Sequence, residues 1–252
     1  MTILNAIENN FYQFYRIFAL AKKDAHILEN GFEVIDSKDN SWPKMIFNLD
    51  QSRLPEKLIP QIATAIDDKH YPPYFIAPEK YISREHISCV KKNSILPVKI
   101  LMGMNFTQKK ENKIILPPKC EIRKLSGESI LADFAELIKQ EFIAPEMSFD
   151  KETLINLSTI NEIQMSGLYY GNILAASMFI LIKENIAGLY FIVTKKEYQN
   201  KGFATLLIKS ALKNLFEIGV KEVVLHANHN SFSLYSKLGF TERNRFIIYR
   251  KV

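Results

Sequence analysis

Residues 191–204 read FIVTKKEYQNKGFA, and this stretch decides how the second half of the chain is interpreted. It begins as an apolar strand, continues as a polar loop with one glycine, Gly202, and opens a helix that runs to about Ile218. The first main-chain N–H groups of a helix have no partner within it and lie at the positive end of its dipole. Gly202 has no side chain to keep a ligand from the main chain, and Ala204 is small. The stretch therefore predicts a cradle for an anion, with phosphate or pyrophosphate as the natural guest.

A second motif follows about thirty residues later, where residues 225–228 read LHAN and residues 231–240 read SFSLYSKLGF. The two motifs together resemble the GNAT superfamily of acetyl-CoA-dependent N-acetyltransferases. The phosphate loop of that family follows the pattern Gln/Arg-x-x-Gly-x-Gly/Ala, which Gln199, Gly202 and Ala204 match. Its later segment ends in Leu-Tyr-x-x-Leu-Gly-Phe, which residues 234–240 match. The resemblance covers roughly the C-terminal half of the chain.

The resemblance implies acetyl-CoA as acyl donor and gives roles to particular residues. The strand that contains Phe191, Ile192 and Val193 is expected to pair its main chain with the pantetheine arm, like an added strand. Asn228 is a candidate contact for the same arm, and Ser231 is a second one. The residues expected to hold the pyrophosphate are Gln199, Asn200, Lys201, Gly202, Phe203 and Ala204, joined by the hydroxyl of Thr205.

The same resemblance implies that Tyr235 gives a proton to the departing CoA thiolate while an amine attacks the thioester. The alternative for Tyr235 is an aromatic side chain that packs its short helix onto the sheet. A general base cannot be assigned, because the strand at residues 187–193 carries no Asp or Glu. Glu162, His226 and His229 remain as weaker candidates.

From Cys120 onward the periodicity predicts a strand, two helices, three strands, a helix, a strand, a helix and a strand. This order fits the GNAT fold, so we expect an α/β (α+β) protein with a mixed, mostly antiparallel central sheet flanked by helices. Residues 107–119, TQKKENKIILPPK, are polar and then interrupted by prolines, which is typical of a linker. We therefore predict two domains, residues 1–119 (the first half) and residues 120–252 (the second half).

The first half begins with a helix whose apolar residues recur at spacings of three and four, and Asn30-Gly31 is interpreted as a helix stop or a turn. Two strands, a helix and a strand follow, then an ambiguous segment at residues 81–100, and a strand from Lys99 to Phe106. This order loosely repeats that of the second half, without a matching phosphate loop. Two interpretations stay open, a degenerate copy of the same fold or a distinct α/β substrate-recognition domain.

In either case we expect the first half to shape the pocket for the acceptor. Its candidate lining residues, which are equally candidates for the core, are Trp42, Tyr71, Tyr74 and Phe75.

The composition excludes several classes of protein. Hydrophobic residues make up 47% and charged residues 24% of the 252, the balance of an ordinary globular chain rather than a disordered chain, a collagen or a coiled coil. Two cysteines without a CxxC pair exclude a disulfide scaffold and offer no zinc site, so no metal is expected. A net charge of +6 suits a polyanionic ligand such as a nucleotide cofactor. No sequence-reading module is present, so nucleic acid is not an expected partner.

The apolar run from Ile173 to Ile182 is too short to span a bilayer, and MTILNAIENN has no basic region followed by an apolar core. We therefore expect a cytoplasmic protein without a membrane partner. The sequence predicts an enzyme that moves an acetyl group from acetyl-CoA to a primary amine of a small molecule or peptide. The missing strand carboxylate keeps open the alternative of a non-catalytic CoA-binding sensor or interaction module. A third interpretation is an aminoacyl- or other acyl-transferase built from two such halves, against which the intact phosphate loop counts. The acceptor, the length of the acyl group and the oligomeric state are not determined by the sequence.

Overall fold

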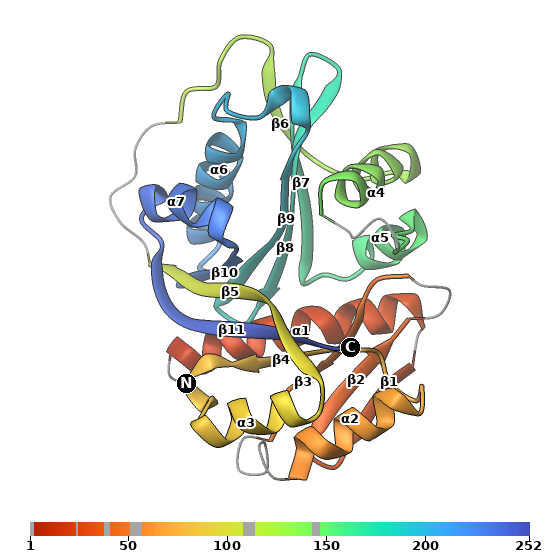
Figure 1. Ribbon diagram of the computed structural model, residues 1–252. Coiled ribbons are helices and arrows are strands. Elements are labelled where there is room, and N and C mark those ends of the chain that lie inside the picture. Colours follow the sequence, from red (N-terminus) through yellow and green to blue (C-terminus); the bar gives the residue numbers. More distant parts are fainter. Residues whose placement is uncertain (1–2, 24, 38–40, 51–56, 108–113, 143–146) are drawn as a thin grey trace.

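The computed structural model describes residues 3–23, 25–37, 41–50, 57–107, 114–142 and 147–252 (Figure 1). The first half contains α1 (Ile3–Lys22), β1 (Ala25–Glu29), β2 (Phe32–Asp36), β3 (Lys44–Phe47), α2 (Ile59–Asp67), β4 (Tyr74–Pro78), η3 (Glu79–Tyr81), α3 (Arg84–Lys92) and β5 (Ile95–Thr107). The second half contains β6 (Cys120–Lys124), α4 (Glu128–Phe142), α5 (Lys151–Ser158), β7 (Ile163–Tyr170), β8 (Ile173–Lys183), β9 (Ile186–Thr194), η4 (Lys196–Tyr198), α6 (Phe203–Glu217), β10 (Glu222–Ala227), α7 (His229–Leu238) and β11 (Thr241–Lys251).

The strands of the described residues form one sheet of eleven, in the order β1-β2-β3-β4-β11-β5-β10-β9-β8-β7-β6. Two neighbouring pairs are parallel, β3 with β4 and β9 with β10, and the other pairs are antiparallel. The expected mixed α/β fold, with a mainly antiparallel sheet flanked by helices, is confirmed.

The two halves repeat one another in the order of their elements. The series β1, β2, β3, α2, β4, α3, β5 corresponds to the series β7, β8, β9, α6, β10, α7, β11, and the parallel pair occupies the same place in each. The last strand of each half lies in the other half, because β5 runs between β10 and β11, and β11 pairs with β4 (Figure 1). The halves therefore share one continuous sheet, and the boundary between residues 119 and 120 stays a prediction.

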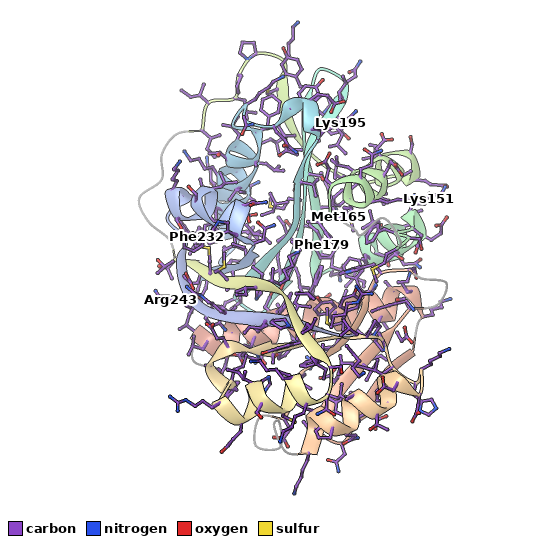
Figure 2. All side chains as sticks on the ribbon, in the orientation of Figure 1. Lys151, Met165, Phe179, Lys195, Phe232 and Arg243 are labelled. Atoms are coloured by element: carbon purple, nitrogen blue, oxygen red, sulfur yellow. The ribbon has the colours of Figure 1, made fainter. Side chains whose placement is uncertain are left out.

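Three apolar cores cover the faces of this sheet. The α1 core joins α1, α4 and α5 to one face, the α6 core joins α6 and α7 to the opposite face, and the α2 core joins α2 and α3 to the strands of the first half. In Figure 2 Met165 and Phe179 lie on the side of α4 and α5, whereas Phe232 lies on the side of α7. Helix α1 comes from the first half yet packs against β9 and β10 of the second, so one helix fastens the halves together.

The structure decides two points that the sequence left open in the first half. Helix α1 ends at Lys22, well before Asn30-Gly31, which forms the turn of the β1–β2 hairpin, with Gly31 at a φ of 111°. The ambiguous segment at residues 81–100 contains α3, which starts where the Ser83 hydroxyl accepts a hydrogen bond from the His86 N–H at 3.1 Å, and the beginning of β5. Of the predicted linker, residues 108–113 lie outside the described residues.

None of the helices in the described part of the chain is both long enough and apolar enough to cross a membrane.

Candidate functional site

The parallel strands β9 and β10 separate halfway along their length. They pair only over Ile186–Leu189 and Glu222–Leu225. Beyond that point β9 bulges against β8, with one extra residue between Tyr190 and Val193, and Phe191 takes a φ of 43°. Because a bulge bends its strand, β9 turns away from β10 and a gap opens between the ends of the two strands.

A cavity of about 560 Å³, called the cleft below, fills this gap. Seven predicted site residues line it, namely Phe191, Ile192, Val193, Gln199, Asn228, Ser231 and Tyr235. The other six predicted residues form the adjoining loop and the first turn of α6, namely Asn200, Lys201, Gly202, Phe203, Ala204 and Thr205. The structure thus brings the two sequence motifs to one place.

The loop that begins α6 has the geometry of an anion cradle. Gly202 is the N-cap residue at a φ of 77°, and no side chain caps the helix. A Cβ atom added to Gly202 would meet nothing within 4 Å, so the main chain is open to a ligand. The N–H groups of residues 203–205 precede the first main-chain hydrogen bond of the helix, from Leu206 to Gly202. The Phe203 side chain is buried in the α6 core, so only its main chain can face a ligand. These features fit the diphosphate of a nucleotide cofactor.

Gln199 fastens the loop to its surroundings. Its side-chain Nε2 donates to the carbonyl oxygen of Thr194 at 3.1 Å and to Glu141 Oε2 at 3.3 Å. The loop starts at the end of β9, which Lys195 marks in Figure 2, and α4 reaches the same place through Glu141. The Gln199 side chain therefore links the end of β9, the loop and α4 to one another.

Tyr235 lies on α7 and its ring is buried in the α6 core. Burial raises the pKa of its phenol to about 12, and a hydrogen bond with Ser231 acts in the opposite direction. Asn228 and Ser231 form a capping box at the start of α7, in which the Ser231 N–H donates to Asn228 Oδ1 at 2.9 Å and the Asn228 N–H donates to Ser231 Oγ at 3.1 Å. This box fixes the turn that carries both residues into the cleft lining.

The floor of the cleft is aromatic and comes partly from α1. The His226 ring stacks on Phe11 with centroids 3.9 Å apart, and Phe14 stacks on Tyr190 at the same separation. The Tyr190 hydroxyl donates to Asn10 Oδ1 at 2.7 Å. Neither ring nitrogen of His226 has a hydrogen-bond partner among the described residues, and burial lowers its pKa to about 3. His226 is therefore neutral at physiological pH.

The remaining candidate bases lie elsewhere. Glu162 and His229 are exposed, and neither lines the cleft. Among the described residues the lining contains one carboxylate, that of Glu141 on α4. The same part of the chain holds no group of three His, Cys, Asp or Glu side chains placed for a metal ion.

The first half supplies one wall of the cleft. Of its four candidate residues, Trp42 and Tyr74 line the cleft, whereas Tyr71 and Phe75 pack in the α2 core. Sequence reasoning missed the further lining residues Phe11, Phe14, Tyr15, Lys44, Met45, Val98, Lys99, Leu101, Ile248 and Arg250. The aromatic stripe of α1 gave a signal for some of these, whereas the residues on β3, β5 and β11 gave none, because they reach the cleft through contacts between strands far apart in the sequence.

Residues 131–240 match the model of the Acetyltransferase (GNAT) family. The second half carries a GNAT domain. Its phosphate-binding motif and its later Leu-Tyr-x-x-Leu-Gly-Phe segment both fall within the matched residues. No curated protein matches the sequence.

Solved GNAT structures resemble the whole chain in fold. A GCN5-related N-acetyltransferase from Kribbella flavida aligns over 96% of this chain and 95% of its own, with a TM-score of 0.69 and 9% identity. A GCN5-related N-acetyltransferase from Sphaerobacter thermophilus aligns over 89% and 81%, with a TM-score of 0.66 and 13% identity. A tandem GNAT protein from the clavulanic acid biosynthesis pathway aligns over 96% and 94%, with a TM-score of 0.58 and 12% identity. The likeness in fold thus extends from the GNAT domain over the first half.

Proposed function

We propose that this protein transfers an acetyl group from acetyl-CoA to a primary amine of a small-molecule or peptide acceptor. The observation that carries the proposal is that a GNAT domain brings the open Gly202 cradle, the separated strands β9 and β10, and the Tyr235 phenol to one cleft. The first is suited to a diphosphate, the second to an extended arm and the third to a leaving group.

The binding steps follow from the main chain of the second half. The N–H groups at the start of α6 hold the pyrophosphate, with Gly202 allowing close approach. Beyond Leu189 the main chain of β9 no longer pairs with β10, and residues 191–193 line the cleft that this separation opens, where we expect the pantetheine arm to lie. Asn228 and Ser231, fixed by their capping box, face the same arm.

When bound, acetyl-CoA supplies an acetyl thioester whose carbonyl carbon can form a bond to an amine nitrogen as its C–S bond breaks. The leaving sulfur then needs a proton, and the Tyr235 phenol donates it. A pKa of about 12 keeps that phenol protonated at neutral pH, as an acid requires. Buried and neutral, His226 makes a poor acceptor for the proton of the amine, because its protonated form is strongly disfavoured.

The first test measures binding of the donor. Thermal unfolding is followed with acetyl-CoA, CoA and ATP in parallel. A ligand at about 100 times its Kd stabilises the fold by roughly 2.7 kcal/mol, which raises the Tm by several degrees. We expect a shift with acetyl-CoA and CoA and none with ATP. No shift with any of the three would contradict the cradle.

The second test measures transfer as release of free thiol across a panel of primary amines. We expect release that depends on both acetyl-CoA and the amine. Tight CoA binding without thiol release on any amine would instead indicate a non-catalytic CoA-binding module, which the absence of a carboxylate on β9 would then explain.

A further inference from the structure

The cleft is lined by positive charge where the first half meets the end of β11. Three cations line it, Lys44 on β3, Lys99 on β5 and Arg250 on β11. The described lining residues contain one carboxylate, that of Glu141, which accepts a hydrogen bond from Gln199 beside the phosphate loop. The cations of the cleft thus come from β3, β5 and β11, whereas its carboxylate comes from α4.

Arg250 and Lys99 lie on the face of the sheet opposite to the phosphate loop. Side chains two residues apart along a strand point to the same face. Ile248 and Leu101, each two residues away from one of the cations, pack against the α1 core. The phosphate loop instead begins α6, whose core covers the other face. These cations are therefore not placed to hold the diphosphate, and they line the part of the cleft open to a second substrate.

A bulge in β5 helps to place Lys99. Ile248 faces Lys99 and Tyr249 faces Pro97, so Val98 is the extra residue. Since a bulge lets neighbouring residues turn toward one side, Val98 and Lys99 both reach the cleft lining. Desolvation by the surrounding protein lowers the pKa of Lys99, although part of its side chain stays exposed to solvent.

Arg250 has the more specific surroundings. Its guanidinium lies over the Tyr74 ring, 5.5 Å from the centroid, and no carboxylate of a described residue pairs with it. Lys44, in contrast, is held by Asp36 at 2.9 Å. A guanidinium that forms no ion pair with a side chain can use its two parallel N–H donors to bind a carboxylate. Tyr74 lies beside it, and Trp42 provides a second flat aromatic surface in the lining of the same cleft.

We propose that the acceptor is an amine that also carries a carboxylate and an apolar or aromatic body, that is, an amino acid or a close relative of one. This rests on the proposed acetyl transfer. Arg250 binds the carboxylate, Trp42 and Tyr74 contact the body, and the amine points toward β9. In the transfer the N–C bond forms, the C–S bond breaks, the sulfur takes the Tyr235 proton, the nitrogen loses one proton to solvent, and the Tyr235 phenolate takes one proton back from solvent. A polyamine would instead face three like charges.

The test compares acceptors that differ by one carboxylate. L-Phenylalanine is paired with phenethylamine and L-leucine with isopentylamine, and spermidine serves as a polycation. We expect kcat/KM to be at least about tenfold higher for each amino acid than for its amine, since a charge-assisted bidentate pair is lost in the amine. Arg250→Gln should raise KM for L-phenylalanine about tenfold and leave phenethylamine unchanged.

Arg123→Gln is the matched control. Arg123 also lies over a tyrosine ring, that of Tyr169 at 4.8 Å, but on the edge strand β6 and outside the cleft lining. This variant should keep the preference of the wild type. Equal or better turnover of phenethylamine, or a preference for spermidine, would overturn the inference and leave the acetyl transfer standing.

If no acceptor releases thiol, the proposed transfer fails, and binding decides the inference separately. Thermal unfolding is then followed in the presence of CoA with L-phenylalanine or phenethylamine. A shift with the amino acid alone, lost in Arg250→Gln and kept in Arg123→Gln, supports a carboxylate site. No shift with the amino acid, or equal shifts with both probes, overturns it.

Discussion

Helices α6 and α2 occupy the same place in the two halves, after the third strand of the repeated series, yet they begin in opposite ways. α6 starts at Gly202, whose surroundings are open. α2 starts at Leu58 and Ile59, which are fully buried in the α2 core, and its next residue is Pro60. A proline has no N–H to offer an anion, and residues 48–58 contain no glycine. One helix start is thus open to a phosphate and the other is closed by its own core.

The comparison shows that the two halves can share an order of elements although only one of them has an open helix start. The first half keeps a parallel strand pair, but β3 and β4 pair only at Ile46 with Phe75, and its apolar helix start faces inward. Its contribution to the site is instead a wall, made by α1, Trp42 and Tyr74. Under the proposed function each half then has one task, since the second half binds the donor and the acceptor lies between the two halves.

The largest expected effect comes from closing the open helix start. Gly202→Glu forces a residue with a side chain into a left-handed φ and places a carboxylate where the diphosphate is expected. We expect CoA affinity to fall by at least about a hundredfold, or about 2.7 kcal/mol, and the thermal shift with CoA to vanish.

The control for this change is Gly219→Glu at the opposite end of α6. Gly219 has a φ of 93°, and an added Cβ would likewise meet nothing within 4 Å. Both variants carry the same kind of backbone strain, so they should lose similar stability. Only Gly202→Glu should lose CoA, and loss of binding in both would show that strain rather than charge is responsible.

Removing one phenol should have the next largest effect. Tyr235→Phe deletes the proton donor while keeping the ring in the α6 core, so we expect kcat to fall about a hundredfold, within the usual range for general acid catalysis, with CoA affinity unchanged. Because the pKa of Tyr235 is about 12, wild-type kcat should not decline between pH 7 and 9 through loss of this proton.

Tyr249→Phe is the matched control for the phenol. Burial also raises the pKa of Tyr249 to about 12, but this residue packs in the α2 core, outside the cleft. Turnover should stay within about twofold of the wild type, since no reacting group touches it. If the two variants lose kcat equally, Tyr235 acts through packing and not as an acid.

A smaller effect concerns the joint between the halves, where His226 of β10 stacks on Phe11 of α1. The folded pKa of about 3 lies below the unfolded value near 6.5, so the unfolded chain binds the proton first as the pH falls. The stability due to neutral His226 is complete above about pH 6.5 and declines below it. We expect a loss of about 2 kcal/mol between pH 7 and pH 5.

Chemical denaturation at several pH values checks this loss. His226→Gln should flatten the dependence over that window, whereas His229→Gln, at an exposed position on α7, should keep the slope of the wild type. An unchanged slope in His226→Gln would mean that other groups cause the acid sensitivity.

The residues of the proposed donor side could be located from the sequence because their signals are local. The accessible main chain at Gly202 and the helix that starts after it depend on a few neighbouring residues, so the local sequence predicted them. The acceptor side could not be read in this way. Tyr74 and Phe75 are adjacent in β4, yet one lines the cleft and the other is core, because the faces of that strand are covered by different helices.

The exchange of strands is the main feature that the sequence did not reveal. The sequence predicted a strand at residues 99–106, but not its partners, which lie more than a hundred residues away in β10 and β11. Arg250 likewise gave no signal, since it reaches the cleft only because β11 crosses to β4. Contacts between segments so far apart depend on packing of the whole fold and leave no local pattern.

The smallest expected effect comes from trying to open the closed helix start. Pro60→Ala returns one N–H to the first turn of α2 and should cost less than about 1 kcal/mol in stability. Titration calorimetry should give one CoA per chain for both the wild type and the variant. Leu58 and Ile59 remain buried in either case, so a restored N–H group still has no open approach and no glycine beside it. A second equivalent of CoA on either protein would mean that the first half kept a donor site, and the contrast between α6 and α2 would then lie in affinity and not in kind.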